Sequence, residues 1–110
     1  MPDPILTEYP DGYKEWRFNG QLHRTDGPAC EYPNGSKAWY LDDRLHRTDG
    51  PAVEYPDGRK VWYLKGLRHR EDGPARIWVD GYREWYLDDK KYTEEEFAMI
   101  QFMKGINIYA

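Results

Sequence analysis

The feature that most constrains the fold is an internal repeat with a period of 23 residues. A Tyr-Pro-Asp-Gly turn, or a close variant of it, recurs at residues 9–12, 32–35, 55–58 and 78–81. A tryptophan recurs at the same interval, as Trp16, Trp39, Trp62 and Trp85. Periods of about 20 to 50 residues are typical of arrays in which each unit packs against its neighbours. We therefore interpret residues 1–110 as a single repeat domain with units 9–31, 32–54, 55–77 and 78–92.

A second motif, His-Arg-x-Asp-Gly-Pro-Ala, follows the tryptophan in the first three units, at residues 23–29, 46–52 and 69–75. In the fourth unit Tyr92 takes the place of the histidine, and the Asp-Gly-Pro segment is absent. Terminal units are commonly altered because they must cap the array. The repeats are therefore expected to end near residue 92.

Each unit reads as short strands joined by tight turns. Asp-Gly and Asn-Gly between apolar runs indicate a hairpin, in which both turn residues are expected to adopt positive φ. Residues 29–32 and 36–41 should therefore pair antiparallel. A second turn, at residues 19–20, 42–43, 65–66 and 88–89, should return the chain through a short strand ending at the histidine. The expected fold class is mainly β: tandem 23-residue hairpin repeats that form an antiparallel meander in a single-layer sheet.

The strand after the first turn has two different faces, because successive side chains point to opposite sides. One face carries a basic residue, a tryptophan and a Phe or Leu in every unit, as in Lys37, Trp39 and Leu41. The other face varies between units. We expect the regular face to be buried or stacked and the variable face to be presented to partners.

The C-terminal segment changes from strand to helix. Thr93 and Glu96 form a capping-box pattern, and Phe97, Ile100 and Met103 recur at helical spacing. These residues predict a short capping helix over about residues 94–104 that covers the last hairpin. Residues 106–109 are expected to add a short strand.

Composition excludes several classes of protein. The 16 basic and 20 acidic residues give a net charge of −4, which argues against a general nucleic-acid binder. Cys30 is the single cysteine, so an intramolecular disulfide is impossible and a reducing, cytoplasmic location is expected. The sequence has no signal peptide and no apolar run long enough to cross a bilayer, so no membrane partner is expected.

The sequence also lacks the motifs of an enzyme or metalloprotein. His23, His46 and His69 lie one repeat apart, or about 10–14 Å at the usual strand spacing, which is too far for convergence on one zinc ion. No nucleophile elbow, phosphate loop or paired-cysteine motif occurs. We expect no catalytic residue, no metal and no cofactor, and interpret the chain as a non-enzymatic binding protein.

Candidate binding residues follow from the differences between units. Residues 55–77 carry six positive and three negative side chains, a net +3, whereas residues 78–96 carry three and seven, a net −4. Repeated positions are expected to build the unit, so specificity should lie where units differ, and aromatics and arginines dominate interface energetics. The predicted partner-binding residues are Tyr40, Arg59, Tyr63, Arg68, Arg70, Arg76, Tyr82 and Tyr86.

Over residues 5–92 the chain resembles the MORN repeat, and more closely the variant units with a His-Arg-x-Asp-Gly-Pro-Ala signature that occur in bacteriophage and giant-virus proteins. The resemblance implies stacked β-hairpins and a protein-binding role. Small phage proteins of this size are often inhibitors of bacterial defence complexes, including anti-CRISPR proteins, which implies action in the host cytoplasm. Two alternatives stay open: binding of single-stranded nucleic acid or nucleotides through the aromatic and basic third unit, and self-association through open sheet edges.

Overall fold

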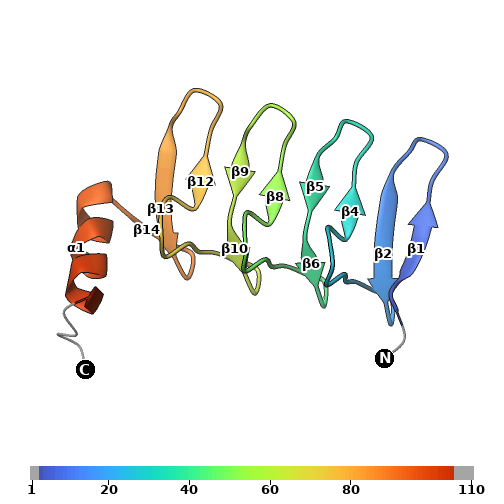
Figure 1. The fold of residues 1–110 in the computed structure, drawn as a ribbon, viewed down its shortest axis with the longest axis horizontal. Helices are drawn as coiled ribbons and strands as arrows, with labels where there is room; N and C mark the ends of the chain where they lie inside the picture. Colours follow the sequence, from blue (N-terminus) through green and yellow to red (C-terminus); the bar gives the residue numbers. More distant parts are fainter. Residues whose placement is uncertain (1–2, 106–110) are drawn as a thin grey trace.

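The structure, a computed structural model, describes residues 3–105; the strand expected at residues 106–109 lies outside this range. Four hairpins stand side by side in one antiparallel layer, and a helix closes the C-terminal end of the array (Figure 1). The mainly β repeat fold is therefore confirmed. The elements are β1 (Ile5–Glu8), β2 (Lys14–Phe18), β3 (Gln21–Leu22), β4 (Cys30–Glu31), β5 (Lys37–Ala38), β6 (Tyr40–Leu41), β7 (Arg44–Leu45), β8 (Val53–Glu54), β9 (Lys60–Val61), β10 (Tyr63–Leu64), β11 (Leu67–Arg68), β12 (Arg76–Ile77), β13 (Arg83–Leu87), β14 (Lys90–Tyr92) and α1 (Glu94–Gly105).

One continuous sheet joins the units, in the order β1-β2-β4-β5-β8-β9-β12-β13-β14, with β3 paired to β2. Consecutive units are joined by the pairs β4 with β5, β8 with β9 and β12 with β13. Within the units, β2 pairs with β4, β5 with β8 and β9 with β12. The middle units therefore add two strands each, which corresponds to roughly 9.5 Å of array length at the usual strand spacing. This regular step places equivalent side chains of successive units in rows along the sheet.

The first turn of each unit differs from the two-residue turn expected from the sequence. In unit one the Tyr9 N–H donates to the Tyr13 carbonyl at 2.9 Å, so three residues connect the strands. Of these three, only Gly12 has positive φ, at 97°. Asp11 instead accepts the Tyr13 N–H at 3.0 Å, which fits a three-residue loop that ends in a glycine bulge. The second turn does match the expectation, since Asp42 and Asp43 have φ of 50° and 67°.

The expected strand over residues 36–41 is divided at its tryptophan. The Trp39 N–H donates to the Ala52 carbonyl of its own unit at 2.7 Å, and the Trp39 carbonyl accepts the His46 N–H at 3.0 Å. Residues before Trp39 pair with the main sheet, whereas residues after it pair with the return strand β7. The tryptophan is therefore the point at which the chain changes pairing partners.

Burial differs from what was expected for the two faces, because the variable face contains buried residues and the tryptophans are not fully buried. Each of the four repeated tryptophans remains half-exposed, whereas Ser36, Ala38 and Tyr86 of the variable face are buried. Ala29, Ala52 and Ala75, the last residues of the repeated motif, are fully buried, and the carbonyl of each accepts the backbone N–H of a repeated tryptophan. Among the described residues the largest fully buried side chain is Cys30, so a thin slab without a deep core results.

The capping helix α1 begins as the sequence predicts. The Thr93 N–H donates to Glu96 Oε1 at 2.8 Å, and the Glu96 N–H donates to Thr93 Oγ1 at 3.1 Å. The helix contacts β13 and β14 and buries Phe97. It ends at Gly105, one residue later than predicted. No helix among residues 3–105 has the length and apolar character needed to span a membrane.

Candidate functional site

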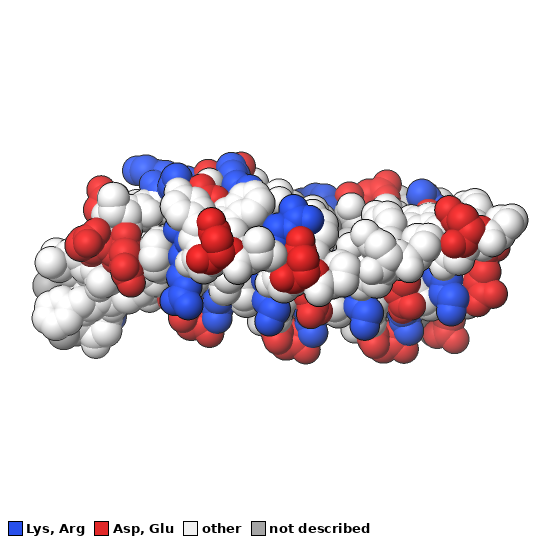
Figure 2. All heavy atoms as spheres, turned by 90° about the horizontal axis from the view of Figure 1, so that it is seen from above, with Lys and Arg blue, Asp and Glu red and all other residues white. Residues whose placement is uncertain are grey.

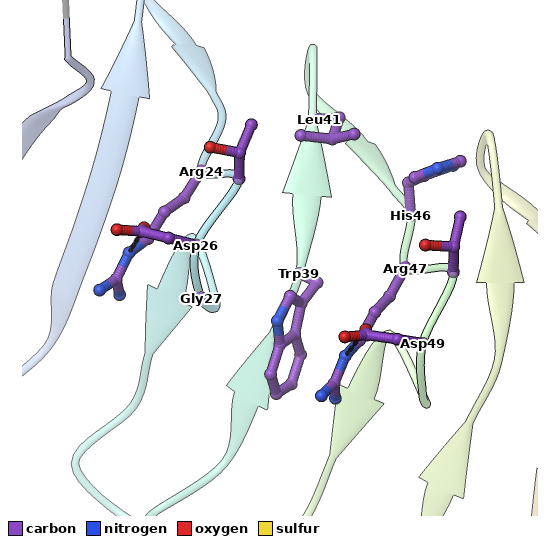
Figure 3. Close-up of a pocket in the computed structure, with 10 residues that line it drawn as sticks. Arg24, Asp26, Gly27, Trp39, Leu41, His46, Arg47 and Asp49 are labelled. Carbon is purple, nitrogen blue, oxygen red and sulfur yellow. Dashed lines mark hydrogen bonds and ion pairs between the residues drawn. The ribbon is translucent and has the colours of Figure 1, made fainter.

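The repeated arginine of each motif covers the repeated tryptophan. The Arg47 guanidinium lies 3.8 Å from the Trp39 ring centre, donates through Nε to Asp49 at 2.9 Å, and through Nη1 to the Pro51 carbonyl at 3.0 Å (Figure 3). The same three contacts recur around Arg24 and Arg70. The tryptophan face was expected to be buried or stacked. It is stacked, because an arginine covers each of these three rings, but the rings are not fully buried.

The repeated histidines join each unit to the next. Nδ1 of His46 accepts the backbone N–H of Lys65 at 2.9 Å, and His23 and His69 accept the equivalent amides of Asp42 and Asp88 at 3.2 and 2.9 Å. Each histidine therefore has a structural bond in a different inter-unit joint. Within residues 3–105 no three His, Cys, Asp or Glu side chains form a group that could hold a metal ion.

Slots on the tryptophan face repeat with the units. One, of about 590 Å³, lies between the Arg24–Gly27 loop and Trp39, and its equivalent, of about 640 Å³, lies between the following loop and Trp62 (Figure 3). Because the same motif residues line both, these slots are a consequence of the repeat. One difference between the two is Glu71 in the second slot, where the first has Thr48.

The variable face carries a cleft that brings several arginines together. A hollow of about 240 Å³ at the boundary between units three and four is lined by the predicted residues Arg59, Tyr63, Arg68 and Arg76, together with Tyr55, Val61, Ile77 and Trp78. Half of the predicted binding residues are therefore brought together in one place. We call this hollow the arginine cleft.

The opposite charges of units three and four meet at this boundary. Arg68 Nε lies 2.6 Å from Asp89 Oδ1, and Arg76 Nη1 lies 3.4 Å from Glu84 Oε1. The hydrogen bond from Arg68 holds the pKa of Asp89 below its usual value. Figure 2 accordingly shows basic and acidic side chains next to one another along the array. The charge difference in the sequence thus contributes to the joint between the two units.

Glu84 is a buried carboxylate within this joint. Burial raises its pKa, but hydrogen bonds from Lys91 and Trp78 and the charge of Arg76 together outweigh that effect, so the pKa of Glu84 is lowered. The group is therefore charged at neutral pH and holds Arg76 and Trp78, two residues that line the arginine cleft.

A larger and more apolar cavity adjoins the arginine cleft on the same face. It measures about 630 Å³, and the two hollows share Tyr55, Val61 and Tyr63. Its other lining residues include the predicted Tyr40 and the apolar Ala38, Leu45 and Val53. We call it the tyrosine cavity.

Three phenol groups of this cavity, those of Tyr32, Tyr40 and Tyr63, stay neutral at physiological pH because their pKa values are raised. Burial raises the pKa of Tyr40 and of Tyr63, and it is the main cause that raises the pKa of Tyr32 to about 12. Neutral phenols both donate and accept hydrogen bonds. The cavity therefore offers aromatic surface with polar tips.

The remaining predicted residues are distributed differently. Arg70 lies on the opposite face, stacked on Trp62 at 3.9 Å, and Tyr82 is exposed on the fourth unit. Tyr86 is buried beneath Arg68, whose guanidinium lies 4.1 Å from its ring centre. The structure therefore does not bring Arg70 and Tyr82 together with the cleft, and Tyr86 supports Arg68 from below.

The lining residues that the sequence reasoning missed include Tyr32, Ser36 and Tyr55. The two tyrosines belong to the repeated turn, so they were interpreted as structural. Ser36 had a visible signal, because the equivalent positions hold Tyr13, Arg59 and Tyr82. It is the one small residue in that series.

Comparison of the chain with protein-family models, with curated proteins and with solved structures finds no match.

Proposed function

We propose that the protein is a non-enzymatic binding module that recognises a protein partner through its variable face. One observation carries this proposal: three arginines from two strands and a loop line one cleft, next to a cavity lined by tyrosines. Arginine and tyrosine are the residue types enriched among interface hot spots, and a pocket beside them offers a place to bury an anchor residue.

The arginine cleft fits a carboxylate of the partner. Arg59, Arg68 and Arg76 each pair with one carboxylate of this chain, at 3.0, 2.6 and 3.4 Å respectively. A guanidinium has five N–H donors, so one such pair leaves donors for a further acceptor. An Asp or Glu side chain of the partner could therefore bind there by charge-assisted hydrogen bonds.

The same ion pairs weigh against nucleic acid as the partner. Binding to a polyanion draws its free energy from neutralised phosphates and released counterions. In this chain the arginines of the cleft are already compensated by Asp57, Glu84 and Asp89. A phosphate chain would meet these carboxylates along with the arginines.

Adjacent basic residues on opposite faces provide a matched test. Arg59→Glu reverses a charge at the cleft, and Lys60→Glu makes the same change on the other face at an exposed position. Arg59 pairs only within its own turn among the described contacts, with Asp57, so its replacement spares the joint between units. We expect a tagged wild-type protein and K60E to retain the same stoichiometric partner from a bacterial lysate, and R59E to lose it with an unchanged circular dichroism spectrum. Equal retention by both variants would remove the cleft from the interface.

The resemblance noted from the sequence leads us to propose a more specific partner, a subunit of a bacterial defence complex that a phage-encoded protein inhibits. Mass spectrometry of the retained partner tests this directly, since a nuclease or defence-complex subunit is the expected identity. A metabolic enzyme or a ribosomal protein as the stoichiometric partner would contradict it.

A second candidate function is self-association through β1. This strand is at the edge of the sheet, all four of its residues are exposed, and Ile5 keeps 72% of its surface accessible. Exposed edge strands with apolar side chains tend to pair with other chains. Size-exclusion chromatography with light scattering tests it: a dimer that Leu6→Pro converts to monomer supports the candidate, and a monomeric wild type excludes it.

A further inference from the structure

A row of aromatic rings runs along the variable face. In unit one the Tyr13 ring lies between two turn tyrosines, with ring centres 5.4 Å from Tyr9 and 5.1 Å from Tyr32, tilted by 33° and 36°. Tilted and offset contacts at such distances are favourable for aromatic pairs. In unit one the residue after the first turn therefore occupies the space between the turn ring of its own unit and that of the next.

The occupant of this space changes from unit to unit. In unit three Arg59 takes the place of Tyr13, and its guanidinium lies 4.1 Å from the centre of the Tyr55 ring. In unit two the equivalent residue is Ser36, whose side chain is too short to reach between Tyr32 and Tyr55. Both of these tyrosines and Ser36 line the tyrosine cavity. The ring row is thus interrupted where the cavity lies.

Ser36 itself is incompletely satisfied. Its residue is 6% exposed, and in the part of the chain that the structure describes its hydroxyl has no hydrogen-bond partner. An unpaired buried hydroxyl destabilises the folded state, because it has lost its hydrogen bonds to water. A ligand with a polar group could remove this cost after a rotation of the hydroxyl about χ1.

We propose that unit two is a receptor for one aromatic side chain of the protein partner, which inserts between Tyr32 and Tyr55 and completes the ring row. This inference rests on the proposed function and names the anchor residue of that interface. The inserted ring occupies the place that Tyr13 fills in unit one, and a phenol or indole edge supplies the partner for Ser36.

The dimensions and the lining support this occupant. The two turn tyrosines lie one repeat apart, roughly 9.5 Å at the usual strand spacing, which is about two ring-to-ring steps of the size seen in unit one. Ala38, Val53 and Val61 also line the cavity, so an inserted ring exchanges water for apolar surface. The adjoining arginine cleft favours an acidic residue next to the aromatic one in the partner. An aliphatic side chain would fill the volume but would gain no contact of the ring-to-ring kind.

The test uses N-acetyl-tyrosinamide as a probe of the cavity in ¹⁵N-labelled protein. We expect fast-exchange shifts of the Ser36, Ala38 and Tyr55 amides with a dissociation constant in roughly the millimolar range. N-acetyl-leucinamide should shift them much less. Adenosine monophosphate serves as the nucleobase arm, and a larger response to it than to the tyrosine probe would overturn a protein side chain as the occupant.

Ser36→Tyr is the decisive variant. Tyr13 and Tyr82 occupy the equivalent positions of other units, so the substitution fits the fold, and the new ring should fill the gap, raise the melting temperature and abolish the probe-induced shifts. Tyr82→Ser, the reverse change on unit four, should leave those shifts unchanged. Retained shifts in S36Y would overturn the proposal.

The same variant separates the anchor from the interface as a whole. If the lysate partner is lost by R59E but retained by S36Y, the protein-binding function stands and the aromatic receptor fails. If S36Y abolishes probe binding while no protein partner is recovered, the cavity is a true aromatic site and the proposed partner class fails.

Discussion

Gly50 offers a sharp test of how the repeated motif holds the tryptophan face. A Cβ added at this position would lie 2.9 Å from Cζ and 3.1 Å from Nη1 of Arg47, which is too close for either atom to stay in place. The backbone of Gly50 does not have positive φ, so alanine itself is not strained there. Gly50→Ala should therefore act by displacing the guanidinium of Arg47 from Trp39.

The cost follows from what Arg47 would lose. Its hydrogen bond to the Pro51 carbonyl is part-buried, and such bonds from charged groups contribute about 1.5–3 kcal/mol. Stacking on Trp39 contributes about 0.5–1 kcal/mol at a partly exposed site, and the pair with the exposed Asp49 contributes less. Losing about half of this total costs about 1–2 kcal/mol. Replacing glycine by alanine at a compatible position stabilises the folded state by about 0.4–1 kcal/mol, because it restricts the unfolded chain. We expect a net destabilisation of about 1 kcal/mol.

A double-mutant cycle with Arg47→Ala isolates the effect, because the clash partner is then absent. In the R47A background, G50A should become stabilising by about 0.5 kcal/mol, so the sign of its effect reverses. Urea unfolding of the four proteins, followed by circular dichroism, measures the coupling. An identical effect of G50A in both backgrounds would refute the reasoning that the motif glycine is required by the arginine.

Three further predictions concern single groups. Burial raises the pKa of Tyr32 to about 12, so the folded state favours its neutral form. The contribution of Tyr32 to stability is therefore complete below pH 10 and is lost as the pH rises towards 12. An ultraviolet titration should show one phenol that titrates near pH 12, and Tyr32→Phe should remove it. The pKa of Glu84 is lowered, so its contribution to stability is present above about pH 4.5 and is lost on acidification. Glu84→Gln should therefore lower the free energy of unfolding by about 2 kcal/mol at pH 7 and reduce its dependence on pH below neutrality. Urea unfolding between pH 3 and 7 measures both effects. Trp62→Ala should cost about 2–3 kcal/mol, less than for a fully buried tryptophan, and an unchanged melting temperature would show that the Arg70 stack does not contribute.

The repeat, the hairpins and the capping helix could be predicted because each depends on residues close together in the chain. Turn residues, strand alternation and the Thr93–Glu96 box act over two to five positions. The order of the strands in the sheet then follows, because strands joined by short connections pair most simply as antiparallel neighbours. The three-residue form of the first turn was not predicted. In this turn Asp11 does not adopt positive φ, and its side chain accepts the Tyr13 N–H.

The roles of the two faces could not be predicted, because they depend on which distant side chain covers which ring. Trp39 looks like a core residue in the sequence, yet the residue that covers it is the charged Arg47, eight positions later. Arg70 was assigned to the interface although the same motif arginine recurs as Arg24 and Arg47, and the structure gives all three the same stacking contact. The rule that repeated residues build the unit was sound, but it was not applied to that arginine.

The absence of bulk at Ser36 was harder to interpret than the presence of an arginine. A search for residues that dominate interfaces selects large side chains, whereas a receptor for a large side chain is marked by a small one. The signal becomes visible only when the four units are aligned and position 36 is compared with Tyr13, Arg59 and Tyr82. Even then, its meaning depends on Tyr32 and Tyr55 lying on either side of it in the folded sheet.

The two faces of the sheet have different roles: the tryptophan face holds the units together, and the variable face provides the differences between units on which specific binding depends. On the tryptophan face the same arginine, aspartate and glycine recur in three units, and in unit four Thr93, the helix cap, stands at the arginine position. Cohesion on that face is therefore supplied by the motif and ends where the helix begins. The variable face is then free to differ from unit to unit, as Ser36 and Arg59 do at one repeat position. The exception is the boundary of units three and four, where Arg68 and Arg76 both line the cleft and hold Asp89 and Glu84. Substitutions at these two arginines should therefore weaken binding and stability together, whereas those at Ser36 and Arg59 should alter binding alone or, for S36Y, raise stability.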